Sequence, residues 1–205
     1  MLPLVKGFPF LILTFSLFLF ISACNGEEEV EPAPEAEVEL TSEEAFFETM
    51  RTFCGEEFYG ETTYIDDPDD EMADAELRIH LAECDENEIR IPFHVDDDAS
   101  RTWILTMDDE GLLFKHDHRH EDGTPEDITN YGGYADHRGD AYHQYFPADE
   151  ETAEMLPEAE TNVWMIEVDL EEMKLIYDLQ RHNEPRYRAE FVLQEEAPGQ
   201  EQQQL

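Results

Sequence analysis

The densest group of chemically active side chains in the sequence is the run from Lys115 to Asp122, KHDHRHED. Side chains on an extended strand alternate between two faces, so His116, His118 and His120 would point to the same face. Histidines at alternate positions lie about 7 Å apart along the backbone. They can bind Zn²⁺ or Cu²⁺ if a neighbouring strand or loop supplies further ligands. The spacing therefore predicts a candidate metal site.

Two other interpretations of these histidines stay open. Imidazole titrates near neutral pH, so the cluster could instead serve general acid–base catalysis without a metal. A strand that leaves the core and enters a polar loop also carries solvated polar residues with no chemical role. Only the fold decides among the three, because each depends on what faces the histidines.

Aromatic and polar residues form a second group of candidates. Ser100-Arg101-Thr102-Trp103 lacks the GxSxG turn that a serine nucleophile requires, and a hairpin turn followed by an ion-paired arginine is the simpler interpretation. The Tyr131-Gly132-Gly133-Tyr134 segment is expected to be a turn with two flanking rings, either packed on themselves or forming a pocket wall. The candidates for a ligand pocket are therefore Arg101, Trp103, Tyr131 and Tyr134.

The elements that must position these residues are mostly strands. Thr41 and Glu44 form a capping box, and apolar residues at helical spacing after it predict a short helix that stops at Gly55. Further on, apolar and polar residues alternate in short runs bounded by Asp, Asn or Gly, which is typical of hairpins. A second short helix is expected near 149–156. We expect eight or nine strands, at 58–65, 77–81, 89–95, 103–107, 112–116, 142–146, 163–168, 175–179 and 187–193.

This pattern predicts an all-β fold with antiparallel strands, either a barrel or a sandwich. A lipocalin-like barrel is favoured because the hairpins follow one another along the chain with short links. The glycines at Gly55 and Gly60 also suit a bent first strand. The α/β alternation that nucleotide-binding loops require is missing.

The N-terminus predicts export and anchoring. The apolar run Phe8 to Ile21 ends in Ile21-Ser22-Ala23-Cys24, which resembles the lipobox of bacterial lipoproteins. The resemblance implies a signal peptide at 1–23 and acylation of Cys24, with palmitate-like chains that insert in the lipid bilayer. Residues 24–40 are a charged tether that extends by self-repulsion. The three glutamates at 27–29 resemble the acidic signals of surface lipoproteins, so the expected location is extracytoplasmic, at the outer membrane or cell surface.

The folded domain is expected at 41–193, followed by a polar, disordered tail at 194–205. With Cys24 used by lipid, Cys54 and Cys84 remain as a pair in an oxidising compartment, which predicts a disulfide. A Cys/His metal site using His80 and Cys84 is the alternative, but it lacks a CxxC pair.

The chain is strongly acidic, with 53 Asp and Glu against 12 Lys and Arg, a formal net charge of −41. Self-repulsion of this size destabilises a compact state unless salt screens it, which indicates adaptation to high salt. A nucleic acid is excluded as a partner, because phosphate neutralisation needs a basic surface. The composition is 40% hydrophobic, so the chain is not simply a disordered acidic polymer.

The run from Arg90 to Tyr134 and the segments after it resemble a group of exported bacterial proteins. The motifs that carry the resemblance, in order, are IPFHV, SRTW, KHDHRHEDG, YGGY, FPAD at 146–149 and NVW at 162–164. This group has no established activity. The resemblance therefore implies one extracytoplasmic domain and transfers no catalytic residue.

Two classes of function remain. A binding module would hold a small molecule or a metal ion in the mouth of the barrel, with the histidine loop at its rim. A hydrolase-like enzyme would use a metal or the histidines as general base. The first is favoured because it needs only a cavity, whereas the second needs converging groups.

Overall fold

The computed structural model describes residues 39–193. The predicted signal peptide (1–23), the lipidation site Cys24, nearly all of the 24–40 tether and the 194–205 tail lie outside the described residues. The predictions made for these segments therefore stay predictions.

The first element is the helix α1 (Ser42–Arg51), which begins as the sequence predicts. The Glu44 N–H donates to the Thr41 hydroxyl at 3.2 Å, and the Thr41 N–H donates to the Glu44 carboxylate at 2.7 Å. This confirms the capping box. The apolar face of α1 is buried through Phe46, Phe47 and Met50.

Eleven antiparallel strands follow, with α2 (Glu150–Met155) and the short 3₁₀ helix η1 (Pro157–Ala159) between the eighth and ninth. No helix within residues 39–193 has the length and apolar run needed to cross a membrane. The strands are β1 (Glu57–Ile65), β2 (Leu77–His80), β3 (Glu83–Cys84), β4 (Glu88–Val95), β5 (Asp98–Asp108), β6 (Gly111–His118), β7 (Tyr131–Tyr134), β8 (His143–Pro147), β9 (Asn162–Asp169), β10 (Lys174–Arg181) and β11 (Glu184–Leu193).

The two strands beyond the expected nine are β3 and β7. The two residues of β3 are too few for alternation to show in the sequence. The glycine pair in β7 was expected to form a turn, and that expectation is wrong. Gly133 is instead required where two strands meet, because a Cβ there would lie 2.0 Å from the carbonyl oxygen of Pro147.

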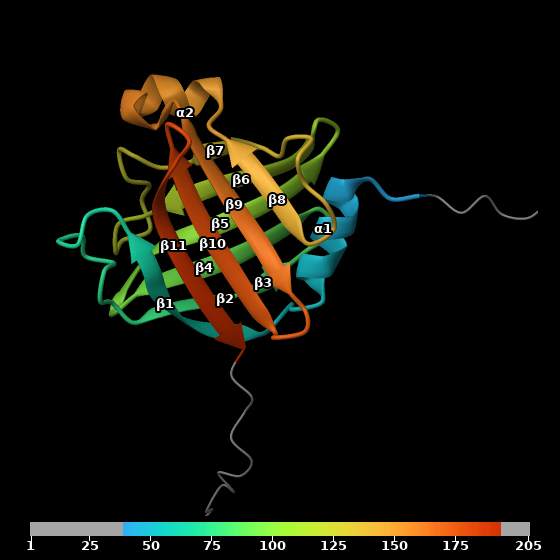
Figure 1. The fold of residues 1–205 in the computed structure, drawn as a ribbon, viewed down its shortest axis with the longest axis horizontal. Coiled ribbons are helices and arrows are strands. Elements are labelled where there is room, and N and C mark those ends of the chain that lie inside the picture. Colours follow the sequence, from blue (N-terminus) through green and yellow to red (C-terminus); the bar gives the residue numbers. More distant parts are fainter. Residues whose placement is uncertain (1–38, 194–205) are drawn as a thin grey trace, which may run out of the picture. The chain divides into compact units, whose positions relative to one another are not determined.

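The strands form one sheet that curls into a nearly closed barrel, which confirms the predicted all-β architecture (Figure 1). The order is β7-β6-β5-β4-β2-β1-β11-β10-β9-β8, with β3 paired to β4. Between the end strands β7 and β8, the seam is held by backbone hydrogen bonds from Asp136 N to Tyr145 O and from Asp149 N to Gly132 O, both 2.9 Å.

A threonine from α2 completes the seam. The buried hydroxyl of Thr152 accepts from the Gly132 N–H at 2.7 Å and donates to the Gly132 carbonyl at 2.9 Å. It thereby satisfies the Gly132 N–H at the edge of β7 and adds a second donor to the carbonyl that Asp149 N also reaches. The seam therefore closes without a continuous β ladder.

One end of the barrel is stapled to α1. The predicted disulfide between Cys54 and Cys84 is present, with Cα atoms 6.1 Å apart, which excludes the alternative metal site at Cys84. Beside it, Phe53 packs edge-on against Phe58 at the start of β1, with ring centroids 5.3 Å apart. Because β1 runs from this closed end to Ile65, the opposite end is the mouth of the barrel.

Candidate functional site

Strand β6 carries two of the three candidate histidines into the barrel. His116 is buried and His118 is half-buried, both on the inner face near the mouth. The strand ends at His118, opposite Arg101 of β5. His120 lies past this end, exposed in a turn where its N–H donates to the Thr124 carbonyl at 2.9 Å. The structure thus brings His116 and His118 together and places His120 outside.

His116 uses both ring nitrogens inside the protein. Its Nδ1 lies 3.1 Å from the carbonyl oxygen of Tyr131, which only accepts, so Nδ1 carries the proton. Its Nε2 therefore accepts from the hydroxyl of Tyr177 at 2.8 Å. Burial, the largest cause, lowers the pKa of His116 to about 3. The imidazole is consequently neutral at physiological pH and forms part of a hydrogen-bonded aromatic interior.

These contacts bear on the predicted metal site. Within residues 39–193, no group of three or more His, Cys, Asp or Glu side chains is arranged to hold a metal ion. A metal at His116 would have to displace the Tyr177 hydroxyl. The Nδ1–H of His116 is held by a backbone carbonyl, as in many metal-binding histidines, but its Nε2, the atom that would bind the ion, is occupied by the Tyr177 hydroxyl.

His118 lines a small inner pocket of about 70 Å³ together with three of the candidate ligand residues, Arg101, Trp103 and Tyr131. The Tyr131 hydroxyl lies 3.1 Å from Nε2 of His118. Desolvation, followed by the charge of Arg101, lowers the pKa of His118. The fourth candidate, Tyr134, is not in this pocket, because its hydroxyl donates to Asp108 at 2.8 Å on an exposed part of the barrel.

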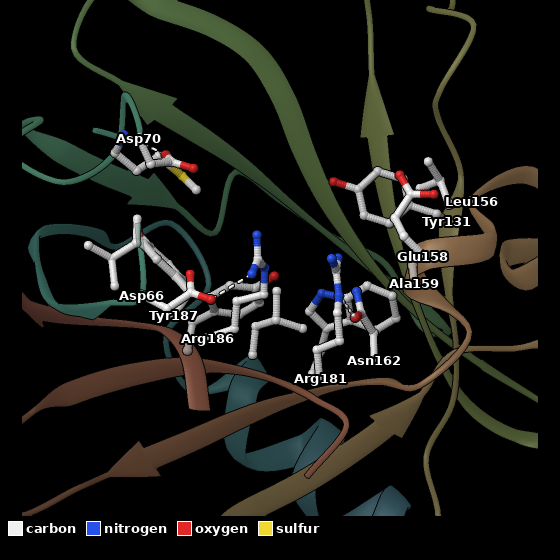
Figure 2. A pocket seen from close by; sticks show the side chains of 15 residues that line it. Asp66, Asp70, Tyr131, Leu156, Glu158, Ala159, Asn162, Arg181, Arg186 and Tyr187 are labelled. Atoms are coloured by element: carbon white, nitrogen blue, oxygen red, sulfur yellow. Dashed lines mark hydrogen bonds and ion pairs between the residues drawn. The ribbon is translucent and has the colours of Figure 1, made fainter. Parts of the chain in front are cut away.

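A larger cavity of about 220 Å³ opens at the mouth of the barrel and shares Met72, Tyr131 and Tyr177 with the inner pocket (Figure 2). Its inner wall is aromatic, and η1 contributes to its rim through Glu158 and Ala159. The full lining is Ile65, Asp66, Asp70, Met72, Tyr131, Leu156, Glu158, Ala159, Asn162, Trp164, Tyr177, Leu179, Arg181, Arg186 and Tyr187.

A β-bulge places an arginine in this cavity. Leu179 of β10 pairs with Tyr187 of β11, whereas the next residue, Gln180, pairs with Pro185, which leaves Arg186 as the extra residue. A bulge re-aims side chains that strict alternation would send to the other face. As a result, Arg186 and its neighbour Tyr187 both line the cavity.

The two arginines of the cavity differ in their partners. Arg186 forms an ion pair with Asp66, with 2.6 Å between Nη1 and Oδ2. Arg181 instead donates from Nε to the amide oxygen of Asn162 at 2.8 Å. Figure 2 shows both guanidinium groups extending from one side of the cavity into the space below Asp70 and Tyr131. Arg186 is therefore neutralised locally, whereas Arg181 is not.

The electrostatic surroundings of Arg181 are mixed. Burial is the largest influence and lowers its pKa, the charge of Arg186 lowers it further, and Glu158 and Asp66 oppose the shift. Removing water from a guanidinium without supplying an anion is unfavourable. The cavity therefore combines an aromatic wall with a partly desolvated cation.

Of the residues that line this cavity, the sequence pointed to Tyr131 as a candidate ligand residue. It did not point to Arg181, Asn162, Arg186 or Tyr187. The bulge hides Arg186, since period-two reading assigns it to the outer face opposite Tyr187. Arg181 lies two residues beyond the strand predicted at 175–179, whereas β10 continues to Arg181. Asn162 could not be recognised, because its pairing with Arg181 depends on the β9–β10 register.

This arrangement suits binding more than bond-making. The cavity supplies aromatic surface, hydroxyl groups and two guanidinium groups, and burial keeps the imidazole of His116 in the neighbouring inner pocket neutral. These are the features of a small-molecule site, in which apolar walls supply affinity and a few polar groups fix orientation. No protein-family model, curated protein or solved structure matches this chain.

Proposed function

We propose that this protein is a cell-envelope lipoprotein whose barrel binds a small organic molecule at its mouth. The single observation that supports the binding role is the cavity of about 220 Å³ at the mouth, which shares Met72, Tyr131 and Tyr177 with the inner pocket beside His118. The volume is below the roughly 300–1,000 Å³ of pockets for drug-sized molecules. The ligand is therefore small, or part of it remains outside the cavity.

The proposed anchoring to lipid through Cys24 rests on the apolar run at 8–21 and the Ile21-Ser22-Ala23-Cys24 motif that follows it. Together with the acidic tether, it would hold the domain near the outer membrane or the cell surface. The hydrolase alternative gains no support from His116, because both of its ring nitrogens are used by Tyr177 and by the backbone.

The test is a screen of small organic acids, amines and neutral compounds against the mature protein in lipid nanodiscs, with binding measured by calorimetry and empty nanodiscs subtracted. The Leu179→Trp substitution would fill the cavity, since Leu179 lies in its lining. Gln180→Trp is the matched control, because Gln180 is the exposed neighbour on the same strand. We expect bound compounds to be lost with Leu179→Trp and retained with Gln180→Trp. Binding that persists in both variants, or no binding at all, would contradict the proposal.

A further inference from the structure

The cavity contains an arginine side chain, Arg181, that forms no ion pair with an Asp or Glu side chain of the described residues. Among residues 39–193, Arg181 is the only Lys or Arg side chain with no Asp or Glu oxygen within 4.0 Å. In a chain with 53 acidic and 12 basic residues, an unpaired arginine is the least expected arrangement. An uncharged amide, that of Asn162, takes the place of the acid.

The part of Arg181 that faces the cavity is its hydrogen-bonding end. The guanidinium carries five N–H donors in a planar fork, of which Nε is used by Asn162. The terminal Nη1 and Nη2 groups have no hydrogen-bond acceptor within the described part of the chain. Because Asn162 is buried and holds the Nε, the fork is oriented before any ligand arrives. This end of the guanidinium matches a carboxylate, which it binds through two parallel hydrogen bonds.

We propose that the cavity binds a small monocarboxylate, whose carboxylate pairs with Arg181 and whose apolar body packs on the aromatic wall. This inference rests on the ligand-binding function proposed above and names its ligand class. The wall consists of the rings of Tyr131, Trp164, Tyr177 and Tyr187. The Tyr177 and Tyr187 hydroxyls are occupied by His116 and Thr62, so these rings offer mainly apolar surface.

The other charges in the lining restrict the ligand to a single negative charge. Asp66, Asp70 and Glu158 line the same cavity, and only Asp66 is paired with Arg186. A second carboxylate on the ligand would face these acids without a cation to neutralise it. A monocarboxylate satisfies Arg181, whereas a dicarboxylate or a phosphate ester carries excess charge into an acidic rim.

The test compares two compounds that differ only in charge, phenylacetate and phenylacetamide, by calorimetry on the mature protein in lipid nanodiscs. Hydrogen bonds to charged groups are the strong ones, so the wild-type protein should prefer the acid by about tenfold or more. Arg181→Met should abolish this preference. If Arg181→Met does not fold, Arg181→Gln keeps an amide donor for Asn162 and removes the charge.

Arg188→Met is the matched control, because it removes the same charge from the outer face, where Arg188 pairs with Asp178 at 2.6 Å. It should leave the preference for the acid unchanged. Equal affinity of the two compounds for the wild-type protein would overturn the monocarboxylate inference but would still support binding of small molecules in the cavity. A preference that survives in both Arg181 variants would also overturn it. Failure of both compounds to bind would contradict the inference and the binding function together.

Discussion

The Nε2 atom of His116 accepts a 2.8 Å hydrogen bond from the hydroxyl of Tyr177, with both side chains buried inside the barrel. His116 lies on β6 and Tyr177 on β10, and the two residues are 61 positions apart in the sequence. Protonation of Nε2 would remove the acceptor and place a charge in a desolvated site. Burial of the imidazole is the largest cause that lowers the pKa of His116 to about 3.

The buried imidazole should make stability depend on pH. An unfolded histidine titrates near 6.5, so between pH 6.5 and about 3 the unfolded state binds one more proton than the folded state. The contribution of His116 is complete above pH 6.5 and is lost as pH falls, at about 1.4 kcal/mol per pH unit well below 6.5. The free energy of unfolding, measured with denaturant at several pH values between 7 and 5, gives this slope.

Burial also lowers the pKa of His94 and His118, so the wild-type slope contains their contributions in the same direction. His116→Gln isolates one group, and its unfolding free energy should fall less steeply with acidification. His120→Gln, in the exposed turn, should keep the wild-type slope. An unchanged slope in His116→Gln would show that this histidine is not held neutral by the fold.

The disulfide between Cys54 and Cys84 should contribute substantially to stability. It links residues 30 positions apart, for which the chain-entropy relation gives about 3–4 kcal/mol. The Cys54→Ser, Cys84→Ser double variant should therefore unfold at lower denaturant concentration, and the reduced wild-type protein should behave in the same way. Equal midpoints for oxidised and reduced protein would contradict a stapling role for this bond.

The barrel seam should be sensitive to one methyl group. Gly133→Ala would place a Cβ against the Pro147 carbonyl and force β7 and β8 apart, at a cost of about 1–3 kcal/mol or more. Gly111→Ala is the comparison, since Gly111 has positive φ but open space around it. It should cost about 1 kcal/mol from backbone strain alone. Thermal unfolding of both variants shows which one loses more stability. A smaller loss of stability for Gly133→Ala than for Gly111→Ala would refute the close approach of Gly133 to the Pro147 carbonyl.

Salt should stabilise the protein. Surface ion pairs such as Arg51–Glu48 contribute about 0–1 kcal/mol each and weaken with salt. Repulsion at a net charge of −41 acts over the whole surface, so its relief should outweigh their loss. The melting temperature should rise with sodium chloride and level off near 1 M, where the Debye length is about 3 Å. A melting temperature that is flat or falls from low salt upward would rule out salt adaptation.

Features that depend on neighbouring residues can be read directly from the amino-acid sequence. The capping box of α1 spans four residues, and the alternation of Ile89, Ile91 and Phe93 with polar residues marks β4. The disulfide could be predicted from the number of cysteines, because the predicted acylation of Cys24 leaves Cys54 and Cys84 as the remaining pair. In each case the deciding interaction is either local or a choice between few alternatives.

The residues that line the cavity, in contrast, come together only through contacts between distant parts of the chain. Arg181 meets Asn162 across 19 positions, and His116 meets Tyr177 across 61, because strand register brings them together. Arg186 enters the cavity for a different reason, the bulge between β10 and β11, which changes the face that a side chain occupies without changing the residues around it. Strand pairing also separates His120 from His118: the strand ends where its pairing with β5 ends, and that is a property of two strands together.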